Sequence, residues 1–183
     1  QWPIIHIVRR FGSVGGMESY VWHLVHGLAR QGLLVVVVCE EVIQLPECDI
    51  PIVTVDVSEE RSRWKSMLSF RRRVDEKIKT LFNGRKVLIH SHERSLSHHV
   101  TTFHGPPIDI PSLPKCLSFF QRRLFAWVAM ENDELLGPSV QTVLAVSNKV
   151  KQELIMRYPR VLVKNIDVAW PGVIPNTDSG IIL

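Results

Sequence analysis

Short apolar runs alternate with amphipathic segments along most of the chain. The runs are bounded by turn residues and several are apolar on both sides, which is typical of strands buried between layers of helices. We expect strands at residues 4–8, 34–38, 52–57, 86–90, 100–103, 141–146 and 161–169. Between them, apolar residues recur every three or four positions and predict helices after the first, third, fifth and sixth strands. This alternation predicts an α/β domain with a mostly parallel sheet and helices on both faces.

Capping and turn residues mark the ends of several predicted helices. Gly32 follows the first helix, Asn83–Gly84 follows the second, and Ser147 precedes the last as its N-cap. Arg71 interrupts the apolar stripe of the second helix. The segment after the fifth strand has prolines at positions 106, 107, 111 and 114 and is too long and irregular for a simple connector. We therefore expect it to form a functional surface.

Length and composition favour a soluble globular domain. The chain has 183 residues, of which 45% are hydrophobic and 22% charged, so disorder is a poor explanation. The longest apolar run, Leu33–Cys39, is far below the roughly 20 residues that a membrane span needs. Cys39, Cys48 and Cys116 are widely spaced and odd in number, which argues against a disulfide framework or a zinc cluster. We therefore expect a cytoplasmic protein.

The excess of positive charge is concentrated between Arg61 and Lys86. The net charge is +4, and the acidic residues in this stretch are only Asp75 and Glu76. The predicted polyanion or membrane surface consists of Arg61, Arg63, Lys65, Arg71, Arg72 and Arg73. Such a stretch attracts anionic lipid headgroups, phosphorylated glycolipids or nucleic acid, or it is an ordinary solvated helix face. Aromatic residues do not interleave with it as a base-stacking surface requires, so we expect no nucleic-acid partner.

Glycines follow the first predicted strand, where doubly wound sheets bind their ligands. Gly12, Gly15 and Gly16 would let the backbone approach an anion at the N-terminus of the next helix. Their G-x-x-G-G spacing is neither the dinucleotide fingerprint nor a P-loop. Taken alone, such glycines are more often a structural turn.

The glycine turn is the first of five motifs in a fixed order. Gly15-Gly16-Met17-Glu18 precedes a helix that ends in Ala29-Arg30-Gln31-Gly32 before a Val-rich strand. The others are His90-Ser91-His92, Thr102-Phe103-His104-Gly105, Val143-Leu144-Ala145-Val146-Ser147 and Val168-Ala169-Trp170-Pro171-Gly172-Val173. Together they resemble the family-4 retaining glycosyltransferases of GT-B fold. The resemblance implies that residues 1–172 form the N-terminal, acceptor-side Rossmann-like domain, and that residues 173–183 begin an interdomain linker or are a cut end.

The last motif departs from the common form of the family. Pro171 replaces the Asn of the usual N-G-V-D hinge. The variant is closer to the lipopolysaccharide-core glucosyltransferases, which often read P-G-I/V-x-P at this point. This likeness raises a lipopolysaccharide or other cell-envelope acceptor.

The resemblance also implies roles for individual residues. Gly15 and Gly16 would face the donor diphosphate, and His104 would lie near the reacting sugar as the catalytic residue. A histidine there could titrate near neutral pH. His90 and His92, with Glu93 and Arg94, would line the acceptor cleft. His90, His92, His98 and His99 have no tetrahedral zinc pattern, so we expect no metal.

The activity that the resemblance implies needs a second domain. In GT-B enzymes of this kind, the nucleotide-sugar donor, such as a UDP-sugar, is bound mainly by a second Rossmann-like domain with a Glu-x7-Glu segment. We expect this chain to be inactive without that domain, the reaction to retain anomeric configuration, and no separate cofactor to be needed. The basic helix, with Trp64, Met67 and Leu68, would dock peripherally on the anionic inner membrane.

Three other functions remain open from the sequence. A GT-B sugar-nucleotide epimerase shares the doubled Rossmann architecture. A non-catalytic nucleotide-binding module predicts ligand binding by this domain alone, although the glycine spacing counts against it. A polyanion-binding structural domain is supported only by the charge between Arg61 and Lys86.

Overall fold

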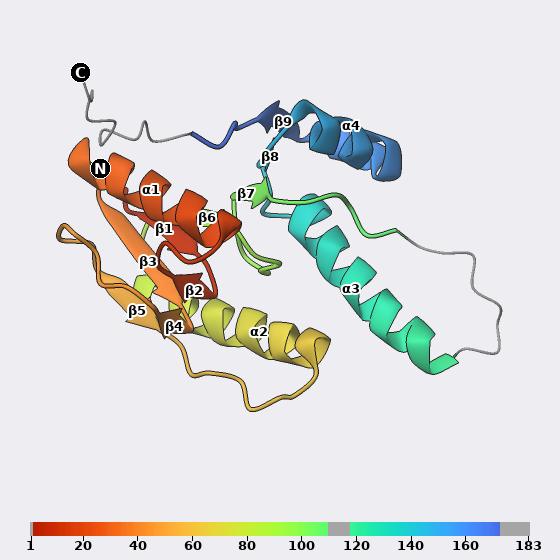
Figure 1. Ribbon diagram of the computed structural model, residues 1–183, viewed down its shortest axis with the longest axis horizontal. Helices are drawn as coiled ribbons and strands as arrows, with labels where there is room; N and C mark the ends of the chain where they lie inside the picture. Colours follow the sequence, from red (N-terminus) through yellow and green to blue (C-terminus); the bar gives the residue numbers. More distant parts are fainter. Residues whose placement is uncertain (1, 110–117, 173–183) are drawn as a thin grey trace, which may run out of the picture.

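A seven-stranded sheet with parallel pairing throughout forms the centre of the computed structural model, which describes residues 2–109 and 118–172 (Figure 1). The strand order is β5-β3-β1-β6-β7-β8-β9. The strands are β1 (Ile4–Ile7), β3 (Val35–Cys39), β5 (Ile52–Thr54), β6 (Leu88–Ser91), β7 (Val100–Phe103), β8 (Thr142–Ala145) and β9 (Asn165–Val168). The parallel sheet confirms the predicted α/β class.

Helices cover both faces of the sheet, as predicted, but unequally. Helix α1 (Gly16–Arg30) packs on one face, against Val35 and Val37 of β3. On the opposite face lie α2 (Arg63–Phe82), α3 (Ser118–Leu136) and α4 (Asn148–Arg157). Right-handed crossovers explain this unequal distribution. The connection through α1 leads toward the β5 edge of the sheet, whereas the connections through α2, α3 and α4 lead toward the β9 edge. Crossovers of the same hand that run in opposite directions place their helices on opposite faces. Side chains alternate along β1, so Ile5 and Ile7 face α2, whereas His6 faces the α1 side.

A second, two-stranded sheet was not predicted. It pairs β2 (Arg10–Phe11) with β4 (Glu41–Val42) in parallel, directly beyond β1 and β3. Gly12 follows it with φ +155°, and a Cβ there would come within 3.0 Å of the Ile43 Cβ. A side chain at position 12 would collide with the segment after β4, so the close approach of these two segments requires a glycine.

The predicted helix ends are confirmed. Gly32 and Gly84 have φ of +78° and +70° just beyond α1 and α2. The Ser147 Oγ accepts a hydrogen bond of 3.2 Å from the Val150 N–H, which caps α4.

The last predicted strand was wrong in its first half. Residues Pro159–Val163 form a 3₁₀ helix, and β9 begins at Asn165. In this helix Val161 is fully buried while Leu162 and Val163 are exposed, so the apolar run is not a strand facing two helix layers. The third strand also ends earlier than predicted, at Thr54 instead of residue 57.

Three other expectations concern membrane spans, the cysteines and the proline-rich loop. Within the described residues, no helix combines the length and apolarity needed to cross a membrane. Cys39 and Cys48 are free thiols. Pro111, Pro114 and Cys116 lie outside the described residues, so the structure tests only the first part of the proline-rich loop.

Candidate functional site

The predicted site residues gather at the carboxyl edge of the sheet, where the neighbouring strands β1, β6 and β7 end. The segment after β1 leads to Gly15 and Gly16, the segment after β6 begins with His92, and His104 follows β7. Parallel strands end at one edge, so three segments far apart in the sequence meet there.

The N-terminus of α1 is formed by the two predicted glycines. Gly15 is the N-cap, in an extended conformation, and Gly16 is the first helical residue. The carboxylate of Glu18 lies against Gly15, where it suits the positive end of the helix dipole. Apart from the adjoining residues and the backbone of the helix itself, no atom of the described residues lies within 4 Å of the place where a Gly16 side chain would begin. The first turn of α1 therefore has open space beside it.

Two adjoining hollows lie at this edge and share Met17, Glu93 and Arg94. The smaller, of about 180 Å³, is lined by His92, His104 and Gly105 among others. The larger, of about 560 Å³, is bounded by charged side chains of both signs: Arg9, Arg10, Arg63, Arg94, Glu18, Glu40, Glu41 and Glu93. The predicted Glu93 and Arg94 thus stand between His104 and a polar cleft.

Arg94 is held in place by α3. Its Nη2 donates a hydrogen bond to the fully buried Glu131 Oε2 at 3.0 Å, and its guanidinium lies over the Trp127 ring. Glu131 Oε1 also accepts from the Ile108 N–H at 2.9 Å and from the Tyr158 hydroxyl at 2.7 Å. One buried carboxylate therefore fixes both Arg94 and the beginning of the proline-rich loop.

Sequence reasoning missed the ion pair of Arg9 and Glu40 in the larger hollow. The Arg9 Nη2 lies 2.6 Å from the Glu40 Oε2 and donates to the Ser66 Oγ at 3.0 Å. Glu40 Oε1 is buried without a hydrogen-bond partner among the described residues. The signal was present, because Arg9 and Glu40 each directly follow the end of a buried apolar run.

A layer of histidines lies behind the small hollow, on the α1 side of the sheet. His92 Nδ1 lies 3.3 Å from His104 Nε2, and His92 Nε2 lies 3.1 Å from His6 Nδ1. His90 Nε2 lies 2.7 Å from the Thr102 hydroxyl. Tyr20 of α1 presents its ring edge-on to His92 and His104, which encloses the layer. His6, a residue that the sequence analysis did not single out, thus joins the predicted His92 and His104.

Burial keeps these histidines uncharged. It lowers the pKa of His6 and of His104 from 6.5 to about 4, and those of His90 and His92 well below the usual value. The expectation that His104 titrates near neutral pH is therefore wrong. A neutral imidazole at this place can still donate or accept a hydrogen bond.

Two carboxyl groups, by contrast, titrate near neutral pH. Burial raises the pKa of Glu93 to about 7, against the opposing effect of the nearby Arg9 and Arg94. Burial likewise raises the pKa of Glu134 to about 7, opposed by Arg94 and by the hydrogen bond from the Thr101 hydroxyl. Glu93 lines both hollows and Glu134 lines the smaller one, so both carboxyl groups could exchange a proton there at pH 7.

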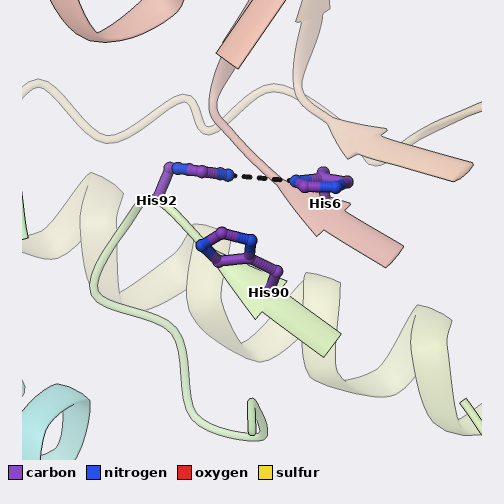
Figure 2. A group of neighbouring side chains, drawn as sticks. All are labelled: His6, His90 and His92. Atoms are coloured by element: carbon purple, nitrogen blue, oxygen red, sulfur yellow. Dashed lines mark hydrogen bonds between the residues drawn. The ribbon is translucent and has the colours of Figure 1, made fainter. Parts of the chain in front are cut away.

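The four histidines considered for zinc in the sequence do not come together. His98 bonds the Ser95 hydroxyl and the backbone carbonyl of Glu134, and His99 accepts a hydrogen bond from the Ile89 N–H. His90 and His92 instead form a group with His6, in which one possible ligand atom of each lies within 4.8 Å of the others (Figure 2).

The predicted basic surface needs one correction. Arg71 is buried in α2, where its Nη2 pairs with Asp133 Oδ2 at 2.7 Å, so it is not part of an exposed surface. Arg61, Arg63, Lys65 and Arg72 are exposed, and the half-buried Arg73 donates to the Asp56 backbone carbonyl. Of the apolar residues expected at the membrane, Met67 is buried in the core beneath α2, and Trp64 and Leu68 are half-buried against it.

The chain matches the model of Glycosyltransferase Family 4 over residues 14–176, a range that includes all five motifs. The chain belongs to glycosyltransferase family 4. No curated protein sequence matches this family-4 chain.

Two solved structures share the fold. One is WaaG, a glycosyltransferase involved in lipopolysaccharide biosynthesis, with a TM-score of 0.67 and 14% identity over 94% of this chain. The other is a glycosyltransferase from Rickettsia africae ESF-5, with a TM-score of 0.53 and 20% identity over 94% of this chain. The family-4 chain spans 46% and 44% of their lengths, so it corresponds to about half of each.

Proposed function

We propose that this family-4 chain is the acceptor-side half of a glycosyltransferase that moves a sugar from a nucleotide-sugar to a glycan or glycolipid. The observation that carries the proposal is that the first turn of α1, through Met17 and Glu18, meets His104 and the Glu93–Arg94 pair around two adjoining hollows. Backbone N–H groups at a helix N-terminus suit a diphosphate, and a cleft with charges of both signs suits the hydroxyls of a sugar.

Each residue has a proposed role in that reaction. Gly15 and Gly16 approach the donor diphosphate, His104 hydrogen-bonds the reacting sugar, and His92, Glu93 and Arg94 position the acceptor. Most of the acceleration would come from positioning and from stabilising the leaving diphosphate. We propose a hexosyl transfer with retention, in which an oxygen of the donor phosphate accepts the acceptor proton. A lipopolysaccharide or other cell-envelope acceptor is supported by the P-G-V-x-P segment at residues 171–175.

The donor nucleotide would be held mainly by a second domain. Isothermal titration calorimetry of this chain with UDP-sugars is therefore expected to show dissociation constants of about 1 mM or weaker. This corresponds to a binding free energy no more favourable than roughly −4 kcal/mol. Micromolar binding to the chain alone would contradict this division of labour and would favour the nucleotide-binding module instead.

We also propose that exposed basic side chains of α2 and of the residue just before its N-cap, Arg61, bring the enzyme to the cytoplasmic face of an anionic membrane. Arg61, Lys65 and Arg72 are free of ion pairs in the described part of the chain, and each basic residue near an anionic surface contributes about 1 kcal/mol. Because the apolar side of α2 packs against the core, membrane binding would depend on electrostatic attraction and not on insertion of apolar side chains into the bilayer.

Co-sedimentation with anionic liposomes tests the membrane proposal. The triple variant Arg61→Glu, Lys65→Glu, Arg72→Glu is expected to lose at least roughly 100-fold in partitioning, and wild-type binding should weaken with salt. A control triple variant, Lys149→Glu, Arg157→Glu, Arg160→Glu, makes the same charge change on exposed positions of α4 and the 3₁₀ helix. Equal binding to neutral vesicles, or equal losses in both variants, would be inconsistent with the proposal.

A further inference from the structure

We propose that His6, His90 and His92 form a binding site for one zinc-type divalent cation beneath the small hollow. His6 and His90 are directly paired in the register of β1 and β6, and His92 follows two residues after His90, so all three side chains leave the sheet on the α1 side. Figure 2 shows His6 and His92 facing one another end to end, with the His90 ring beside their contact.

The spacing of the three rings suits shared coordination. The 3.1 Å between His6 Nδ1 and His92 Nε2 is close to the separation of two nitrogens that each lie about 2.0–2.1 Å from one tetrahedral zinc ion. One nitrogen of His90 completes the group within 4.8 Å. Three histidines with a fourth position left for water are the ligand set of zinc sites of the open type.

The surroundings of the trio supply the partners that metal-binding histidines usually have. His90 Nε2 is next to the Thr102 hydroxyl at 2.7 Å, and His92 Nδ1 is next to His104 Nε2 at 3.3 Å. Such contacts orient the rings and leave the other nitrogen of each ring for a metal.

One ligand of the trio lies at the wall of a hollow, because His92 and its neighbour Thr102 line the small hollow of about 180 Å³. His6 and His90 do not line it, so the proposed ion would be held on the protein side of His92. The proposed ligand atom of His6 is Nδ1, whereas the buried Nε2 of the same ring has no hydrogen-bond partner among the described residues.

The chemistry of the group selects the class of cation. Imidazole nitrogens favour Zn²⁺, Cu²⁺, Ni²⁺ or Co²⁺, whereas Mg²⁺ and Ca²⁺ prefer oxygen ligands. A cation here would lie behind His104 and tie together the ends of β1 and β6. This inference stands on the geometry of the trio and does not depend on the proposed transferase reaction.

Equilibrium dialysis of the EDTA-treated chain against Zn²⁺ tests the proposal. We expect one ion per chain and, at 100-fold excess over the dissociation constant, a rise of about 5–10 °C in the midpoint of thermal unfolding. His6→Phe keeps a ring in the core and is expected to weaken Zn²⁺ binding by at least roughly 100-fold, beyond the effect of changing an outer partner. His98→Phe replaces a buried histidine outside the trio and should leave Zn²⁺ affinity unchanged.

X-ray absorption of the wild-type zinc-loaded chain provides a readout that needs no variant. Three imidazole ligands would support the site even if His6→Phe fails to fold. Substoichiometric binding by the wild type, unchanged affinity in folded His6→Phe, or a zinc shell dominated by oxygen would overturn the proposal.

Discussion

His104→Ala, in a two-domain enzyme that contains this chain, is expected to lower kcat by about 100- to 1000-fold, the usual effect of removing one hydrogen-bonding group that acts in the transition state. His104 lies at the carboxyl end of β7, on the wall of the small hollow, and His92 holds its ring through the 3.3 Å contact. Burial lowers its pKa to about 4, so in the proposed role it would act as a neutral hydrogen-bonding group. Its loss should therefore reduce kcat at all pH values from 6 to 8.

A matched control separates this effect from the loss of any buried histidine. His98→Ala removes a buried histidine that bonds Ser95 and the Glu134 backbone carbonyl and that lines neither hollow. We expect it to lower the unfolding temperature and to leave the kcat of the folded enzyme near wild type. If His104→Ala kept more than a tenth of the wild-type kcat, the catalytic assignment of His104 would be wrong.

The second large effect is a pH-dependent gain in stability from Glu134→Gln. Burial raises the pKa of Glu134 to about 7 in the folded chain, whereas a carboxyl in the unfolded chain ionises near 4.5. The folded state therefore binds more protons between these values, and the contribution of Glu134 to stability is full below pH 4.5 and lost as the pH rises to about 7. Glutamine has nearly the same shape, can accept the Thr101 hydrogen bond and does not ionise.

Urea unfolding of both proteins at pH 4.5, 6 and 7.5 measures this effect. Relative to wild type, Glu134→Gln is expected to gain roughly 2–3 kcal/mol of unfolding free energy between pH 4.5 and 7.5, since one pKa unit corresponds to about 1.4 kcal/mol. Glu76→Gln, at an exposed position of α2, controls for the loss of a charge. A difference between Glu134→Gln and wild type that stays constant with pH would show that Glu134 ionises normally.

Most of the sheet could be predicted from the sequence because its strands are short apolar runs with clear turns between them. The same signal failed at residues 161–163, where an apolar run forms a 3₁₀ helix with only Val161 buried. Hydropathy alone cannot separate a strand buried on both sides from a turn that buries one side chain. The pairing of β2 with β4 could not be foreseen either, because each strand has only two residues.

The residues of the candidate site that the sequence pointed to are those in the five motifs. His104, Glu93 and Arg94 follow strands in recognisable segments, and the structure brings them to one edge. His6 lies inside an apolar strand, and its contact with His92 depends on the register of β1 against β6, which the sequence does not reveal. Arg71 was placed on the surface because it belongs to a basic run, whereas its partner Asp133 is 62 residues away on α3.

Sugar transfer can be measured with a two-domain protein that contains this chain. Radiolabelled nucleotide-sugars would be incubated with cell-envelope glycolipids, and the product linkage determined by NMR. We predict that the labelled sugar becomes attached to an acceptor with the anomeric configuration of the donor. Conversion of the nucleotide-sugar to its epimer, with no label on any acceptor, would contradict the proposed transferase function and favour the epimerase.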